Sequence, residues 1–135
     1  MKLLLMVTTV VEGAVGLGLF VMPAVLVPML LGSPIDTPTG MVAARLAGAA
    51  ILALAVCCWQ ARNSEHSGAG LGVVTAMLFY NVAAAAVLVY AGVRLGLQSP
   101  YIWPIIVLHS VMALWCAAVV WFAMRKQQAS AADGE

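Results

Sequence analysis

The stretch LGVVTAMLFYNVAAAAVLVYAG, which runs from Leu71 to Gly92, shows the kind of segment that decides this fold. It contains no charged residue, and its length is close to the ~20 apolar residues that cross a bilayer as a helix. Three other stretches are of similar length and almost entirely apolar, at about 3–22, 41–60 and 103–124. We therefore predict an all-α protein in which residues 1–124 form a four-helix transmembrane bundle. Residues 125–135 are expected to form a short, disordered cytoplasmic tail.

The composition excludes several classes of protein. Of the 135 residues, 64% are hydrophobic and only 8% are charged, which is too little polar surface to cover a soluble domain of this size. The formal net charge is +1, and the six Lys and Arg residues are scattered along the chain. Because a polynucleotide site needs clustered positive charge, binding to nucleic acid is not expected.

The segment between the first two spans is rich in proline. Pro23 and Pro28 lie in an apolar run that would overshoot the bilayer if the first helix continued to Leu31. We predict a short proline-led helix here, either at the membrane interface or re-entering against the bundle. The first span resembles the start of a secretory signal, but Glu12 interrupts its apolar run, so we expect it to be retained.

The positive charges predict a topology. Lys2, Arg62, Arg125 and Lys126 fall on one side of the predicted membrane, whereas Arg94 stands on the other. The positive-inside rule then places both termini in the cytoplasm. The aromatic residues near the ends of the spans are expected to lie at the interfaces. They are Trp59, Tyr90, Tyr101, Trp103 and Trp121.

Each span carries one strongly polar residue, and these are Glu12, Arg45, Asn81 and His109. Such groups are costly in hydrocarbon, so they normally face the bundle interior and find partners. Helical rise places Glu12 and Asn81 near mid-membrane and Arg45 and His109 ~8 Å nearer the outer surface. The long side chain of Arg45 can cover that difference, so we predict one polar cluster of the four residues.

Three interpretations of this cluster remain open. In the first interpretation, Glu12 and Arg45 form a structural ion pair that fixes helix register, and Asn81 and His109 supply hydrogen bonds. Alternatively, the cluster binds a polar headgroup or small ligand, or it relays protons or ions. Thr8, Glu12 and Gly16 recur four residues apart and so share one helix face, which supports an inward direction for Glu12.

No reaction motif is present. The sequence lacks GxSxG, HExxH, P-loop and dinucleotide-binding patterns, so an enzyme is not supported and no metal site is predicted. Haem would need a second axial ligand at the depth of His109, and His66 lies in a predicted cytoplasmic loop, which leaves only Met112 as a candidate ligand, so haem is not expected. The cofactor is therefore unknown, and a quinone whose carbonyl accepts a hydrogen bond from His109 or Asn81 stays open.

Two sequence blocks resemble small four-helix bacterial membrane proteins of the DoxX-like type. They are MPAVLVPMLLG at Met22–Gly32 and ARLAGAAILALAV, which opens the second span at Ala44–Val56. The resemblance covers most of the chain but rests on apolar patterns. It implies an accessory role beside membrane-bound redox systems, and it carries over no catalytic residue.

These observations lead to three hypotheses about function. The first is a non-catalytic accessory or assembly subunit of a larger inner-membrane complex, because the chain has almost no extramembrane mass and no reaction motif. The second is a small-molecule or lipid-binding protein, or a transporter that works as a homo-oligomer through Glu12 and Arg45. The third is a quinone-linked redox helper. The first two predict partners of different kinds: other membrane chains, or further copies of this chain.

Overall fold

The computed structural model describes residues 1–64 and 68–132, and this part of the chain forms five helices and no strand. The helices are α1 (Lys2–Val21), α2 (Pro23–Leu31), α3 (Pro38–Ala61), α4 (Gly68–Arg94) and α5 (Ile102–Ala132). Four of them, α1, α3, α4 and α5, are long and apolar enough to cross a membrane. The predicted all-α fold with a short proline-led helix after the first span is confirmed, and the chain is a multi-pass helical membrane protein.

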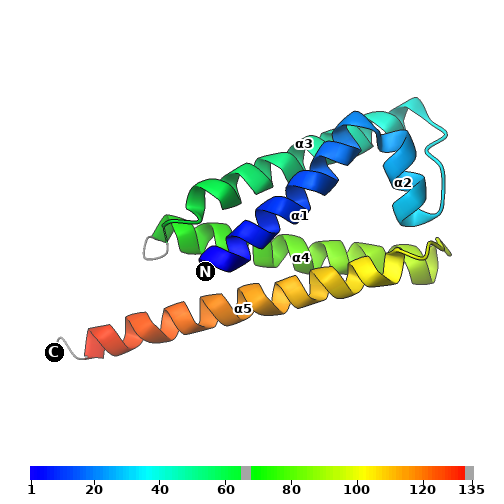
Figure 1. Ribbon diagram of the computed structural model, residues 1–135. Coiled ribbons are helices and arrows are strands. Elements are labelled where there is room, and N and C mark those ends of the chain that lie inside the picture. The colour runs from blue at the N-terminus through cyan, green and yellow to red at the C-terminus, as the bar shows by residue number, and fades with distance from the viewer. Residues whose placement is uncertain (65–67, 133–135) are drawn as a thin grey trace.

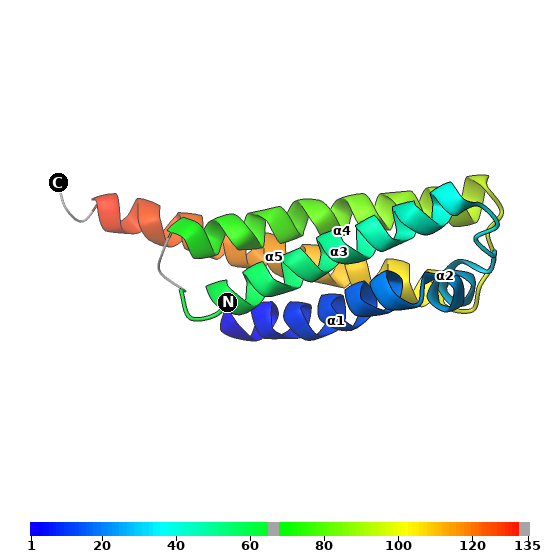
Figure 2. The ribbon, with the colours of Figure 1, turned by 90° about the horizontal axis from the view of Figure 1, so that it is seen from above.

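The four long helices are arranged as two pairs. α1 packs along α3 and α4 packs along α5, while contacts between the pairs are far fewer. Figures 1 and 2 show both termini at one end of the bundle and α2 at the other end, where the pairs diverge. The pairs meet in a core near the termini, to which every long helix contributes. Its buried residues are Leu4, Leu5, Cys58, Ala61, Val74, Met77, Met112 and Cys116.

Glycine allows α1 and α3 to approach closely. A Cβ atom at Gly48 would lie 2.6 Å from the backbone nitrogen of Phe20 and 2.8 Å from the carbonyl oxygen of Gly16. Small residues at helix crossings are the usual way that helices pack in lipid, where no hydrophobic effect drives association. The Thr9 hydroxyl adds a bond across the same interface, at 3.3 Å from the carbonyl oxygen of Ala55. This pair is the most tightly packed part of the fold.

Helix α2 turns the chain back across the end of the bundle. α1 ends at Val21, and its C-cap residue Met22 donates its amide to the Gly18 carbonyl at 2.8 Å. Pro23 then starts α2 in the position where a missing amide hydrogen costs nothing. Gly32 ends α2 with a φ of 75°, a left-handed conformation that glycine adopts without steric cost. The next long helix starts with an N-cap, because the Thr37 side chain accepts from the Gly40 amide at 3.0 Å.

The helix bounds agree with the predicted spans except at the C-terminus. The expectation that residue 125 begins a disordered tail is wrong for residues 125–132, since α5 continues to Ala132. Arg125, Lys126 and the two glutamines that follow are good helix formers, so the helix propagates beyond its apolar part. The predicted interfacial aromatics, Trp59, Tyr90, Tyr101, Trp103 and Trp121, are all exposed.

Candidate functional site

Glu12 lies between the two helix pairs. It is buried, and its Oε2 atom accepts a hydrogen bond from the Tyr80 hydroxyl at 3.1 Å. Because Glu12 belongs to α1 and Tyr80 to α4, this bond connects one pair to the other. A carboxyl group removed from water needs such a donor, because burying even a neutral polar group without a hydrogen-bond partner costs ~2–7 kcal/mol.

Asn81 and His109 form a second connection, within the α4–α5 pair. The Asn81 side chain is 1% exposed, and its amide nitrogen donates to the Met77 carbonyl at 2.8 Å. Its Oδ1 atom lies 2.9 Å from Nδ1 of His109. The His109 ring also packs edge-on against Tyr80, with ring centroids 5.7 Å apart. Glu12, Tyr80, His109 and Asn81 are therefore connected in sequence by two hydrogen bonds, with the ring contact of Tyr80 and His109 between them.

The hydrogen bonds of Asn81 set the proton position on His109. Since the amide nitrogen is used by Met77, the oxygen faces the imidazole and must accept from an Nδ1–H group. The remaining nitrogen, Nε2, is then an acceptor in the neutral ring. The Asn81 amide nitrogen has a second N–H beyond the one that Met77 accepts, whereas neutral His109 has no donor left. Of the two predicted donors to a quinone carbonyl, the geometry therefore leaves Asn81, and the quinone itself stays a prediction.

The side chains of His109 and Asn81 meet, although helical rise predicted a difference of ~8 Å in their depth. The segment between α4 and α5 folds back along the last turn of α4. The Leu97 amide donates to the Ala91 carbonyl at 3.1 Å, and Ile102 reaches 3.5 Å from the Cβ position of Gly92. Helix α5 therefore starts beside Gly92, in the last turn of α4.

Thr8 is a buried polar group without a partner. Its side chain is 1% exposed, and its hydroxyl oxygen makes no hydrogen bond within the described residues. Thr8 precedes Glu12 by one helical turn, and both are buried together with Gly16, as the shared face predicted. A hydroxyl in this position has donor and acceptor capacity to offer beside the Glu12 carboxyl group.

Arg45 does not join these residues. It is exposed on α3, and no ion pair links it to Glu12 or to any other acidic group among residues 1–64 and 68–132. The predicted Glu12–Arg45 pair is therefore not formed. Ala44 and Gly48 face inward more than Arg45 does, because the helix turns ~100° per residue and the small residues take the side that contacts α1. The structure brings Glu12, Asn81 and His109 together and leaves Arg45 outside.

The sequence prediction missed Tyr80 as the partner of Glu12. Tyrosine is typical of membrane interfaces, but Tyr80 lies in the middle of a predicted span. That unusual position indicated that its hydroxyl group needs a buried partner. Its neighbour Asn81 was chosen instead as the polar residue of that helix. His66, which we placed in a cytoplasmic loop when considering haem, lies outside the described residues.

Comparison with known proteins adds no assignment. No family model matches this chain, and no curated protein or solved structure matches it either. The resemblance to DoxX-like proteins therefore stays a prediction, and function must be inferred from the geometry of the site and of the bundle surface.

Proposed function

We propose that this protein is a non-catalytic accessory or assembly subunit of a larger membrane complex. The observation that carries the proposal is Arg45, an exposed cation on a helix that is apolar enough to cross a membrane. A charged group at such a position is costly, by about 2.5–3.5 kcal/mol at mid-helix on insertion scales, unless it reaches the interface or finds a partner. Glu12 does not supply that partner.

The surroundings of Arg45 suit a second helix. It lies seven residues into α3, which corresponds to a depth of ~10 Å along the helix axis. Neighbouring positions on the same exposed face combine large apolar and small side chains, which are Val42, Leu46, Ala49, Ala53 and Val56. We call this set, with Arg45, the α3 outer face. Small residues let another helix approach, and the guanidinium group requires a carboxylate or exposed carbonyl groups on it.

The cellular setting is part of the same proposal. We place the protein in a bacterial inner membrane with both termini in the cytoplasm. Support comes from positive charges at the start of α1, the end of α3 and the C-terminal part of α5, which are Lys2, Arg62 and Arg125. The resemblance to DoxX-like proteins supports a complex that is linked to redox chemistry. In this setting the protein holds or assembles its partner and performs no reaction itself.

Replacing Arg45 by methionine tests the proposal, because methionine keeps the length of the side chain and removes the charge. We expect the wild-type protein, gently extracted from its host membrane, to carry other membrane chains at fixed stoichiometry in native mass spectrometry. Arg45→Met should lower the recovered complex by about tenfold or more, as expected for a desolvated ion pair, while Arg45→Lys retains part of it.

Arg94→Met is the matched control, since Arg94 is also exposed but lies at the end of α4. Its complex should be recovered at the wild-type level. A wild-type protein that is extracted alone, or only with further copies of itself, contradicts the accessory role. Equal loss in the Arg45 and Arg94 variants would indicate a general effect of charge and would also contradict it.

A second function is favoured by one specific observation, the unpartnered hydroxyl group of Thr8 beside Glu12. We infer that a small polar ligand that enters between the helix pairs would be bound by the Thr8 hydroxyl and the Glu12 carboxyl group, with Tyr80 holding the latter in place. This makes the protein a small-molecule binder or an oligomeric transporter, without a role for Arg45.

Glu12→Gln separates the two functions. Glutamine has nearly the same shape and can still accept from Tyr80, so the free energy of unfolding should change by less than ~1 kcal/mol, whereas binding of a small adduct should be lost. The measurement is native mass spectrometry of the adduct, with Thr75→Val as the control because Thr75 is exposed on α4. An adduct retained by Glu12→Gln contradicts the ligand-binding function.

A further inference from the structure

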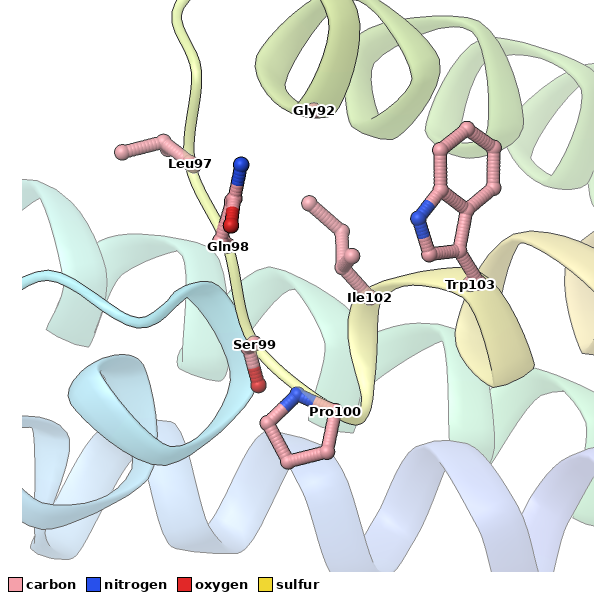
Figure 3. A pocket seen from close by; sticks show the side chains of 7 residues that line it. All are labelled: Gly92, Leu97, Gln98, Ser99, Pro100, Ile102 and Trp103. Carbon is pink, nitrogen blue, oxygen red and sulfur yellow. The ribbon is translucent and has the colours of Figure 1, made fainter.

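The end of the bundle opposite the termini carries an open pocket of about 560 Å³. It is formed by the last turn of α4, the connecting segment and the first turn of α5, and Figure 3 shows its side chains. The lining residues are Gly92, Leu97, Gln98, Ser99, Pro100, Ile102 and Trp103. None of these residues is charged, so the pocket favours a ligand that places an uncharged group in it.

The pocket has an apolar floor and a polar rim. Ile102 is 1% exposed and forms the floor with Gly92, while the Gln98 amide and the Trp103 indole stand on either side of it. The indole nitrogen lies on the edge of the ring that faces Ile102. No hydrogen bond to either side chain is formed by the described residues, so both N–H groups are available to a ligand.

The backbone that carries Gln98 is held in place by α2. The Ser99 hydroxyl donates to the Met29 carbonyl at 2.6 Å and accepts from the Tyr101 amide at 3.2 Å. Gly32 lies so close that a Cβ atom there would be 1.8 Å from the carbonyl oxygen of Gln98. These contacts fix the connecting segment before any ligand binds, which reduces the entropic cost of binding.

The position of the pocket indicates its occupant. It lies where two membrane-spanning helices end, which is the level of the ester and headgroup region of a bilayer. Below Trp103, the same face of α5 continues with exposed apolar residues at helical spacing: Val107, Val111 and Leu114. From Trp103 to Leu114 this face extends ~16 Å along the helix, which is comparable to half of the hydrocarbon core.

We propose that this pocket binds the glycerol-ester region of a diacyl phospholipid from the adjacent leaflet. The N–H groups of Gln98 and Trp103 donate to the ester carbonyl oxygens, and one acyl chain lies along Val107, Val111 and Leu114. The uncharged lining fits the ester carbonyls rather than the phosphate group. The site is distinct from the α3 outer face and from the contacts of Glu12, so it does not depend on the proposed function.

The experiment compares an ester lipid with an ether lipid, because an ether lipid lacks the carbonyl acceptors but keeps the headgroup and chain length. The purified full-length protein is equilibrated in micelles with an equimolar mixture of dioleoyl and dioleyl phosphatidylcholine, and native mass spectrometry records the retained lipid. We expect the ester lipid to be retained about five- to tenfold over the ether lipid, as two hydrogen bonds allow.

Two variants test the assigned donors. Trp103→Phe removes the indole N–H group but keeps an aromatic ring, and Gln98→Leu removes the amide from an exposed position. Each should reduce the preference for the ester lipid severalfold, and the double variant should abolish it. Trp121→Phe is the matched control, because Trp121 lies near the other end of the apolar part of α5 and is 56% exposed, as Trp103 is.

Three results would overturn the proposal. The first is equal retention of the two lipids by the wild-type protein, and the second is an unchanged preference in the double variant. The third is an equal loss of preference in Trp121→Phe, which would indicate that interfacial tryptophans bind ester lipids wherever they stand. Circular dichroism of each variant verifies that the helical content is retained, so that a changed preference reports on the pocket.

Discussion

Replacing Gly48 with leucine is expected to separate α1 from α3 and to cause the largest loss of stability of any single substitution considered for this chain. The nearest atoms to a Cβ at this position belong to the backbone of α1, namely the nitrogen of Phe20 at 2.6 Å and the oxygen of Gly16 at 2.8 Å. Backbone atoms inside a helix cannot move as a flexible side chain can. The helices must therefore shift apart, at a cost of about 3 kcal/mol or more.

Gly72→Leu is the control for this prediction. Gly72 lies in α4, and no atom lies within 4 Å of its Cβ position, so the substitution there changes helix propensity without a collision. Unfolding free energies of both variants, measured by denaturant titration in micelles, should differ by the packing cost of α1 on α3. Equal stability of the two variants would show that this helix pair is not held by the close contact of its glycines.

Gly32→Ala is expected to detach α2 from the segment between α4 and α5. Two costs combine at this position. The φ of 75° is unfavourable for alanine by about 1–2 kcal/mol, and the new Cβ would lie 1.8 Å from the carbonyl oxygen of Gln98. Since neither α2 nor the connecting segment can relieve so short a distance by a small shift, the contact must open, which adds about 1–3 kcal/mol.

Gly96→Ala carries only the first of these costs, so comparison with it isolates the collision at Gln98. Gly96 also has a positive φ, of 67°, but nothing lies within 4 Å of its Cβ position. Amide hydrogen exchange of residues 95–101, measured with the unfolding free energy, should rise strongly in Gly32→Ala and only slightly in Gly96→Ala. If the two variants exchange at the same rate, backbone strain alone explains the effect and the packing of α2 on this segment is unimportant.

The transmembrane helices could be predicted because hydropathy is a local property of the sequence. Pro23 also marked the start of α2 correctly, since proline has a defined place in a first helical turn. The direction of Arg45 could not be predicted in the same way. Its helix is apolar on every side, so periodicity carries no information about which face is buried, and only the close contact at Gly48 decides it.

The partners of the polar residues depended on the relative level of two helices, which sequence order does not contain. The contact between His109 and Asn81 depends on how the chain turns from α4 into α5, where the Leu97 amide bonds back to Ala91, and the pattern of residues did not specify that turn. The pocket beside Trp103 was hidden for a related reason. Trp103 was interpreted as an interfacial anchor. It lies across the pocket from Gln98 only because α2 fixes the connecting segment.

The bond between Ser99 and Met29 also has a consequence for biogenesis. Its two residues are separated by 70 positions, so the carbonyl group of Met29 has no such donor while the ribosome is still producing the first three spans. Helix α2 can form early, but the surface on which it packs is completed only when the segment between α4 and α5 has been made. The order of translation therefore delays completion of the end opposite the termini until Ser99 has been made, and a nascent chain arrested before residue 99 would present that end uncovered to the insertion machinery.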